Sequence, residues 1–392
     1  MENVLIVSAC RSPVGKLLGK LSSLTAPQLG ALVIKEAIRR SHIKPPLVNE
    51  VIMGNVLSAG IGQNPARQSA ILSGLPNTVA ALTIDKVCAS GLKAVALGAQ
   101  AIMLGEAEIV IAGGMESMSN APFLLREMRG GKKYGDSEVV DSMIYDGLWD
   151  CYYNEHMGTL CELAVKKYGL SREEQDEFAF QSHKKAMEAT RKGLFKEEIV
   201  PIKVKRGGEE IVVEEDETIR WDTDIEKLSR LKPVFKERGT VTAGNSPGLN
   251  DGAAALILIS ERKAQALKIK PLARIIGFST GHTDPKWYTI APIRSVKNLL
   301  KKTGNKIDDF DLIEENEAFA AQTLTVMKEL SLDPAKVNVN GGAIALGHPI
   351  GASGARILVT LLHALKNRKK ELGLVTICLG GGGAVSMAVR VE

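Results

Sequence analysis

Two segments far apart in the chain open in the same way, and their likeness limits the folds available to the molecule. The first, Cys88-Ala89-Ser90-Gly91, begins an apolar helical stretch, as does Gly351-Ala352-Ser353-Gly354 near the end of the chain. Each stretch is followed by an apolar strand pattern and a glycine-rich turn, at 108–114 and 374–383. This matched order of elements indicates an internal duplication of one α/β unit.

The elements around the first segment predict the kind of sheet. A strand–helix–strand order with nearly continuous apolar strands is typical of a parallel or mixed sheet covered on both faces. The alternation resumes from residue 271, after a further strand at 253–259. The expected early strands are 4–9, 51–56, 82–87 and 109–112, and the expected helices are 25–38, with Thr25 as N-cap, 67–72 and 90–104.

Residues 119–249 differ from the parts on either side, with more charge and an irregular hydrophobic period. They hold one clear amphipathic helix at 171–191, which starts with the capping-box sequence Ser171-Arg172-Glu173-Glu174. They also hold a polar hairpin at 202–213 that turns at Gly207-Gly208. We interpret this part as a loop-rich insertion. The expected units are a first half (1–118 plus 250–270), the insertion (119–249) and a second half (271–392).

Composition narrows the functional classes. The net charge of +5 is mild for 392 residues and is spread along the chain, which favours a solvated surface over a nucleic-acid patch. The five cysteines are widely spaced without a C-x-x-C pair, which argues against disulfides or structural zinc and favours a reducing, cytoplasmic compartment. The apolar start is too short for a signal peptide, and we expect no apolar run of the roughly 18 residues needed to span a membrane.

Cys88 lies where a strand pattern gives way to a helix. A thiol at a helix N-terminus meets unpaired N–H groups and the positive end of the helix dipole, and both are expected to lower its pKa. Its small neighbours leave room for a substrate carbonyl. The alternative is an inert cysteine packed under the helix.

His348 stands among small residues in the segment 341–354. These glycines could bind a dinucleotide phosphate, but the G-x-G-x-x-G order is absent and no acidic residue follows at the expected distance. The other interpretation is a histidine presented on a tight loop as a general base.

Two further positions follow strand patterns. Cys378 precedes the run Leu379-Gly380-Gly381-Gly382-Gly383, whose N–H groups could stabilise an oxyanion or simply form a flexible turn. Asn316 follows the expected strand at 311–313. Its amide is either the N-cap of the next helix or the holder of a water near a reaction centre.

Taken together and in order, these motifs resemble the thiolase family over essentially the whole chain. Each motif alone is moderately specific, whereas the full set in this order is specific. The resemblance implies an α/β fold with thiolase-like duplicated α/β/α/β/α layers and mixed five-stranded sheets. The likeness is carried by Ala9-Cys10-Arg11-Ser12-Pro13, Cys88-Ala89-Ser90-Gly91, Gly113-Gly114-Met115-Glu116-Ser117-Met118-Ser119, Ala243-Gly244-Asn245, Asn250-Asp251-Gly252-Ala253, Asn316-Glu317-Ala318-Phe319, Gly347-His348-Pro349 and Cys378-Leu379-Gly380-Gly381-Gly382.

The resemblance also implies a two-step reaction. Cys88 attacks an acyl-CoA and holds the acyl group as a thioester, with His348 assisting deprotonation. Cys378 then removes the α-proton of a second acetyl-CoA, and the enolate attacks the acyl group on Cys88. One oxyanion hole would combine His348 with a water held by Asn316, and the other the N–H groups of Cys88 and Gly380.

By the same resemblance, the insertion binds CoA. His156 and Met157 would line the pantetheine and acyl pocket, Arg220 would approach the adenine, and Ser246 would lie near the pantetheine arm. The chain departs from the family at Pro247, where a serine is common as a hydrogen-bond partner, and at Trp287-Tyr288, where short-chain members have smaller or thioether side chains. Further expected CoA contacts are Ala243, Ala318 and Phe319.

The expected activity is therefore that of an acetyl-CoA C-acetyltransferase that needs no metal or other cofactor besides its CoA thioester substrates. A degradative 3-ketoacyl-CoA thiolase acting on longer chains is the main alternative, because the motifs are shared. The intact set of reactive residues argues against a catalytically silent acyl-CoA-binding relative, and the missing nucleotide fingerprint argues against a dehydrogenase. The family suggests a homo-oligomer, a dimer or tetramer, with 121–141 as a candidate contact loop.

Overall fold

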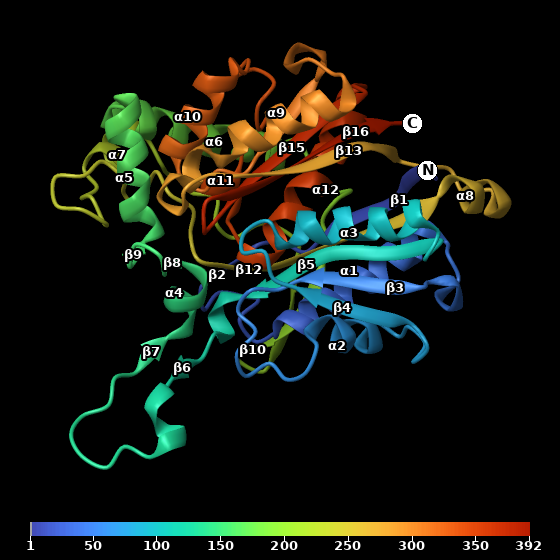
Figure 1. Ribbon diagram of the computed structural model, residues 1–392, viewed down its shortest axis with the longest axis horizontal. Helices are drawn as coiled ribbons and strands as arrows, with labels where there is room; N and C mark the ends of the chain where they lie inside the picture. Colours follow the sequence, from blue (N-terminus) through green and yellow to red (C-terminus); the bar gives the residue numbers. More distant parts are fainter. Residues whose placement is uncertain (1) are drawn as a thin grey trace.

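The computed structural model, which describes residues 2–392, stacks helices and sheets in five layers (Figure 1). Two helices, α3 (Ser90–Leu104) and α12 (Ile350–Arg368), fill the central layer between two groups of strands. One outer layer holds α1 (Ala26–Ser41) and α2 (Pro65–Leu72), and the other holds α9 (Ala291–Thr303) and α10 (Ala320–Leu330). The duplicated, layered fold expected from the sequence is confirmed.

The strands of the two halves follow the same directional plan. In the first half, β3 is parallel to both β4 and β5, while β12 is antiparallel to both β5 and β1. In the second half, β14 is parallel to β15, while β16 is antiparallel to both β15 and β13. The first half has five main strands, in the spatial order β4 (Ala80–Ile84), β3 (Glu50–Gly54), β5 (Ile109–Ser117), β12 (Asn250–Ser260) and β1 (Val4–Arg11). The second half has four, in the order β14 (Leu312–Glu315), β15 (Leu372–Leu379), β16 (Gly383–Val391) and β13 (Ala273–His282).

The two groups of strands meet at one short seam. Leu5 pairs with Arg274 and Ile6 with Ala273, and these two pairs join β1 to β13 in a continuous sheet. The pattern of burial shows what holds the layers together. Alternate residues of β1, β5 and β12 pack on α3 and α12, whereas their neighbours pack on α1 and α2. Both faces of these strands are therefore buried, which explains why their sequences are almost continuously apolar.

The insertion is a single excursion between two neighbouring strands, because β5 ends at Ser117 beside its partner Asp251 in β12. Its hairpin and its long helix form as expected, with Ser171 as a capping-box N-cap and positive φ at Gly207 and Gly208. It contains β6 (Phe123–Leu124), β7 (Val140–Asp141), α4 (Ser142–Gly147), β8 (Trp149–Asp150), β9 (Glu155–His156), α5 (Met157–Tyr168), α6 (Arg172–Arg191), β10 (Ile202–Arg206), β11 (Glu209–Val213) and α7 (Ile225–Ser229).

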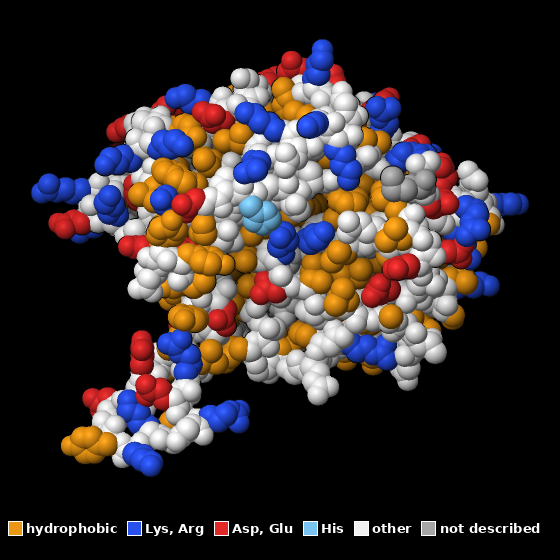
Figure 2. Space-filling view, viewed as in Figure 1, with side chains coloured by type: hydrophobic (Ala, Val, Ile, Leu, Met, Phe, Trp, Pro, Cys, Tyr) orange, Lys and Arg blue, Asp and Glu red, His pale blue; other side chains and the backbone are white. Residues whose placement is uncertain are grey.

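The remaining elements are short connections. They are β2 (Gly15–Lys16), which pairs with β12, α8 (Glu261–Leu267), α11 (Ala343–Leu346) and the 3-10 turns η1 (Pro45–Leu47), η2 (Met118–Asn120), η3 (Arg126–Gly130), η4 (Pro285–Ile290) and η5 (Ile307–Asp309). In Figure 1, β6 and β7 lead into an arm that also contains η3, and Figure 2 shows this arm standing clear of the body of the molecule.

One expectation from composition is wrong. The segment Val87–Leu104 is long enough and apolar enough to pass for a membrane span, with a mean hydropathy of 1.6 over 18 residues. It comprises α3 and the turn before it. Most of its side chains are apolar because the helix lies between the two sheets, whereas Lys93, Gln100 and Leu104 lie along one partly exposed side.

The contact between α3 and α12 depends on two glycines. A Cβ atom on Gly91 would lie 2.8 Å from the backbone nitrogen of Ala355, and one on Gly354 would lie 2.5 Å from that of Leu92. The two helices therefore meet backbone to backbone, at the first turn of α3 and the second turn of α12. Any larger residue would force them apart.

Gly91→Ala tests this contact. We expect the variant to be destabilised by about 1–3 kcal/mol, because a methyl group added to a close-packed contact forces backbone shifts. The change should appear as a lower midpoint in urea unfolding. Gly130→Ala is the matched control, since a Cβ there meets no atom within 4 Å among the described residues. Equal stability of the Gly91→Ala variant and the parent would contradict the close contact.

Candidate active site

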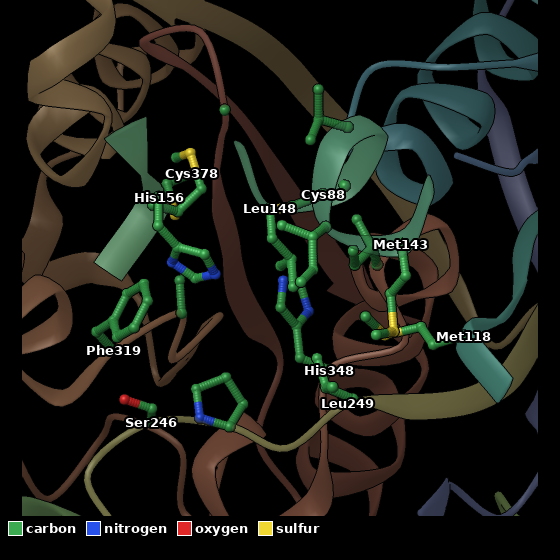
Figure 3. A pocket seen from close by; sticks show the side chains of 18 of the residues that line it. Cys88, Met118, Met143, Leu148, His156, Ser246, Leu249, Phe319, His348 and Cys378 are labelled. Carbon is green, nitrogen blue, oxygen red and sulfur yellow. The ribbon is translucent and has the colours of Figure 1, made fainter. Parts of the chain in front are cut away.

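A cavity of about 270 Å³ lies where the two halves and the insertion meet. It brings together three of the reactive residues expected from the sequence, Cys88, His348 and Cys378 (Figure 3). Most of the other lining residues are apolar, so the polar groups of the site lie in surroundings of low polarity. They are Val87, Met118, Met143, Ile144, Gly147, Leu148, His156, Met157, Phe235, Ser246, Pro247, Gly248, Leu249, Tyr288, Ala318, Phe319, Ile350 and Gly380.

Cys88 lies on a tight turn between β4 and α3. The strand ends at Ile84, earlier than the apolar pattern predicted, because Val87 adopts a φ of 48°. Positive φ is strained for a β-branched residue, and such strain is concentrated at functional sites. The Ser90 hydroxyl holds the turn by donating to the carbonyl oxygen of Val87 at 2.6 Å and accepting from the Lys86 N–H at 2.8 Å.

The expected lowering of the Cys88 pKa is wrong in direction. Burial raises the pKa of this thiol to about 12, although the backbone N–H groups of Gly380 and of Cys88 itself act to lower it. The helix terminus is therefore outweighed by the apolar surroundings, which disfavour a thiolate. Cys88 rests as a neutral thiol and needs a base before it can act as a nucleophile.

His348 is held on the loop between α11 and α12 by two contacts. Its backbone N–H donates to Asn250 Oδ1 at 2.8 Å, and its Nδ1 lies 2.6 Å from Ser353 Oγ. The Ser353 hydroxyl donates its single proton to the carbonyl oxygen of Pro349, so it accepts from Nδ1–H. The imidazole lone pair is therefore on Nε2.

The electrostatic surroundings keep His348 neutral. Burial, with a smaller contribution from the buried Arg356 guanidinium, lowers the pKa of His348 to about 3. The imidazole is therefore neutral at physiological pH with its lone pair on a fixed nitrogen, but its lowered pKa makes it a weak base, so it can take the Cys88 proton only as the sulfur bonds to a substrate carbonyl. Cys88 and His348 thus form a thiol and a base in one cavity.

Cys378 approaches the cavity from the second half, at the end of β15, and only 1% of its side chain is exposed. Burial and the nearby thiol of Cys88 raise the pKa of Cys378 well above its usual value. The next residue but one, Gly380, also lines the cavity and presents its N–H to the Cys88 sulfur. The two candidate donors, Gly380 N–H and Cys88 N–H, therefore converge on one sulfur.

Asn316 lies directly after β14 and is fully buried, but it does not line the cavity. Its interpretation as a helix N-cap is wrong, because α10 begins at Ala320 with Phe319 as its N-cap. Neither side-chain amide atom of Asn316 has a hydrogen-bond partner within residues 2–392. Buried amides rarely go without partners, so this one is suited to hold a water molecule.

Most of the expected CoA contacts line the cavity mouth. His156 is the N-cap of α5, where its Nδ1 accepts from the Gly158 N–H, and its ring stacks on Phe235 with centroids 4.6 Å apart. Phe235 meets Phe319 edge to face. Ser246, Met157 and Ala318 also line the cavity.

Arg220 and Ala243 lie outside the cavity. Both are exposed, and the Arg220 guanidinium donates to the Ala243 carbonyl oxygen at 3.3 Å. The sequence expectation placed Arg220 at the adenine end of the ligand. An exposed cation outside an apolar cavity is compatible with binding a charged part that stays in solvent.

Sequence reasoning missed the buried groups that brace these loops. Glu317 accepts hydrogen bonds from the Ser182 hydroxyl, the Asn338 amide and the Ile344 N–H at 2.8–3.0 Å. Glu116 similarly accepts from the N–H of Gly351 at the start of α12, and burial raises its pKa to about 7. Both residues lie in the motifs named above, but their hydrogen-bond partners are too distant in sequence to be inferred.

Comparison with known proteins identifies the family of the chain. Family models of the thiolase N-terminal domain and the thiolase C-terminal domain match residues 4–262 and 269–391. The chain belongs to the thiolase family. The family and fold predicted from the sequence are thus confirmed.

Individual thiolase relatives match over the full chain. An acetyl-CoA acetyltransferase of Cupriavidus necator is 53% identical over 391 residues, covering 100% of both chains. A probable acetyl-CoA acyltransferase of Staphylococcus aureus is 52% identical, and an acetyl-CoA acetyltransferase of Pseudomonas aeruginosa 51% identical, over 390 residues each. The crystal structure of the Bacillus anthracis acetyl-CoA acetyltransferase superposes with a TM-score of 0.98 at 44% identity, covering 100% of this chain and 99% of that one.

Ser353→Ala tests the arrangement around His348. We expect alkylation of Cys88 by iodoacetamide to slow about 10–100-fold, because a hydrogen bond to a group that becomes charged is worth about 1.5–3 kcal/mol. The rate would be followed on the Cys88 peptide by mass spectrometry. Ser353→Thr keeps a hydroxyl and should retain the faster rate, and Ser386→Ala, a buried serine on β16, should have no effect. An unchanged rate in Ser353→Ala would contradict this role.

Proposed function

We propose that this chain is an acetyl-CoA C-acetyltransferase that condenses two acetyl-CoA molecules reversibly to acetoacetyl-CoA and CoA. The observation that carries the proposal is the meeting of Cys88, His348 and Cys378 in one apolar cavity. A Claisen condensation requires one group to hold an acyl unit while a separate base acts on the second substrate. The names of full-length relatives at 51–53% identity point to the same activity.

In the first step, the Cys88 sulfur attacks the thioester carbonyl of acetyl-CoA. The thiol proton passes to His348 Nε2, which is the basic nitrogen in the cavity, and then to the departing CoA sulfur as its bond to the acyl carbon breaks. Since the Cys88 thiol has a pKa of about 12, the transfer must be coupled to the attack. Converging N–H groups from Gly380 and Cys88 would stabilise the negative charge that develops on the carbonyl oxygen.

In the second step, the Cys378 thiol would first pass its proton to His348 Nε2, and the resulting thiolate would remove a proton from the methyl carbon of another acetyl-CoA. His348, which then carries N–H at Nε2, and a water bound to Asn316 would donate to the enolate oxygen. The enolate carbon forms the new carbon–carbon bond with the acyl carbon on Cys88, and the Cys88 sulfur leaves and takes the proton back from His348. The burial of Asn316 and the absence of any partner for its amide among the described residues support this assignment.

The ring cluster of His156, Phe235 and Phe319 would receive the pantetheine arm, and Arg220 would approach the adenine nucleotide. Pro247 lines the cavity but has no N–H or hydroxyl to donate, so the contact common at this position in the family is absent here. We propose that the reaction needs no metal or nicotinamide. The cysteines, all free and including the exposed Cys151, fit a reducing compartment such as the cytoplasm.

The protruding arm supports a homo-oligomer. Its apolar residues Phe123, Met128 and Tyr134 are 54–95% exposed, which is unusual for surface that stays in solvent. At the other end of the first half, β4 is an edge strand with Leu82 43% exposed. We propose a dimer or tetramer that covers these surfaces.

A degradative 3-ketoacyl-CoA thiolase is the second candidate. The apolar wall formed by Met118, Met143 and Ile144 could accept a longer acyl chain, and relatives in Staphylococcus aureus carry the broader name of acyltransferase. On the side of Cys378, however, the buried Tyr288 ring fills the cavity wall and donates its hydroxyl to the Met157 carbonyl oxygen at 2.8 Å.

Thiolysis of 3-ketoacyl-CoA substrates of increasing length separates the two candidates. We expect acetoacetyl-CoA to give the highest kcat/KM, with a fall of at least about tenfold for chains of ten or more carbons, which is the scale of discrimination that misfitted methylene groups produce. The assay follows loss of the substrate enolate absorbance. A preference for long chains would favour the degradative enzyme, and failure to cleave any 3-ketoacyl-CoA would overturn both.

Replacement of each cysteine should abolish a different step of the reaction. Cys378→Ala should still be acylated by acetyl-CoA, but it should lose exchange of the acetyl-CoA methyl protons with solvent by about 10²–10⁴-fold, because its base is gone. Cys88→Ala should show the reverse, with no acyl-enzyme and residual proton exchange. Mass spectrometry and proton NMR would follow the two events. Equal loss of both events in both folded variants would contradict the division of roles.

A further inference from the structure

A buried glutamate that the proposed reaction does not use lies beside Cys378. Glu315 is the last residue of β14 and pairs with Thr376 in the parallel neighbour β15. Side chains of paired residues point to the same face of a sheet, and so do side chains two residues apart along a strand. Glu315 and Cys378 therefore face the same way, toward the layer that holds α5 and α10.

The carboxyl group of Glu315 is fixed in this position. Only 1% of the residue is exposed, and its Oε1 accepts a hydrogen bond of 2.6 Å from the Gln322 amide on α10. Its backbone N–H and carbonyl oxygen are both bonded to the Asn338 side chain. The second carboxyl oxygen, Oε2, has no partner within residues 2–392. One end of a rigidly held acid is thus left without a partner.

The ionisable groups around this acid are all neutral or negative. Cys378 faces Cys88 at the start of α3, Cys161 on α5 and Glu315 on β14, and the hydroxyl of Tyr288 lies in the same cluster. Glu315 in turn faces Glu317. His348 and His156 line the same cavity as Cys378, and burial lowers the pKa of both, so neither is a cation at rest. Burial together with like charges raises the pKa of both Glu315 and Cys378 well above their usual values. A negative charge on one therefore opposes a negative charge on the other.

We propose that Glu315 is a positioning residue that acts through Cys378, because the two side chains share one buried face on which only one negative charge is accommodated. When Glu315 holds its proton, Cys378 can become a thiolate and serve as a base. When Glu315 loses its proton, the thiolate is suppressed. Glu315 thereby sets the pH range over which Cys378 is a base. The inference rests on the proposed function, which assigns Cys378 that role.

The test measures Cys378 directly, without catalysis. In full-length protein carrying Cys88→Ser, the rate of Cys378 alkylation by iodoacetamide is followed against pH on the Cys378 peptide. Removal of the competing charge in Glu315→Gln should move the midpoint down by about one pH unit, within the range that neighbouring charges produce. At a fixed pH below the midpoint, alkylation should therefore be about tenfold faster. Glu315→Leu serves as a second variant without a carboxyl group.

Glu314→Gln is the matched control. Glu314 is equally buried, but it precedes Glu315 in the strand and so faces the opposite side, toward Arg356. Its variant should leave the Cys378 midpoint in place. An unshifted midpoint in both Glu315 variants, with circular dichroism showing that they are folded, would overturn the proposal, as would an equal shift in Glu314→Gln. Because alkylation needs no substrate, failure of the proposed thiolysis would be seen separately.

Discussion

The backbone contact between the first turn of α3 and the second turn of α12 determines the geometry of the site. Gly91 and Gly354 allow these helices to approach more closely than any side chain would permit. Cys88 and His348 each stand two residues before the first residue of one of these helices, so the contact also fixes the separation of the thiol and the imidazole. The duplicated α/β unit thus has a chemical consequence, because each copy contributes a candidate reactive residue just before its central helix.

The parts of the fold that sequence predicted well are those whose signals are local. Thr25 and Ser171 both form the capping boxes that start α1 and α6. The helix α5 was missed because its N-cap is His156, whose ring nitrogen replaces the usual hydroxyl or carboxylate acceptor. The end of β4 was misplaced because the left-handed conformation of Val87 is set by the surrounding turn, which the apolar pattern does not show.

The candidate site also combines features that local sequence predicts with features that it does not. The meeting of Cys88, His348 and Cys378 was predicted because they lie in motifs, but the direction of the Cys88 pKa shift was not, since burial depends on residues from both halves and the insertion. The hydrogen bond from Ser182 to Glu317 spans 135 positions of sequence, and no local pattern announces such a pairing. Motifs therefore point to candidate reactive residues, whereas the charge states of those residues depend on the assembled core.

The insertion leaves and re-enters the sheet at a single point, between the paired residues Ser117 and Asp251. Sheet pairing therefore closes this long excursion whatever its length, and the entropy of closing a flexible loop rises by only about 0.6 kcal/mol for each doubling of its length. Its packed part is not free to vary, because Ser182 holds Glu317 and because Glu198 and Asp216 hold the buried Arg11 of β1. The arm between β6 and β7 stands clear of the body, so a change in its length would be absorbed in solvent. The fold thus confines its tolerance to insertion and deletion to the part of the segment that does not touch the framework.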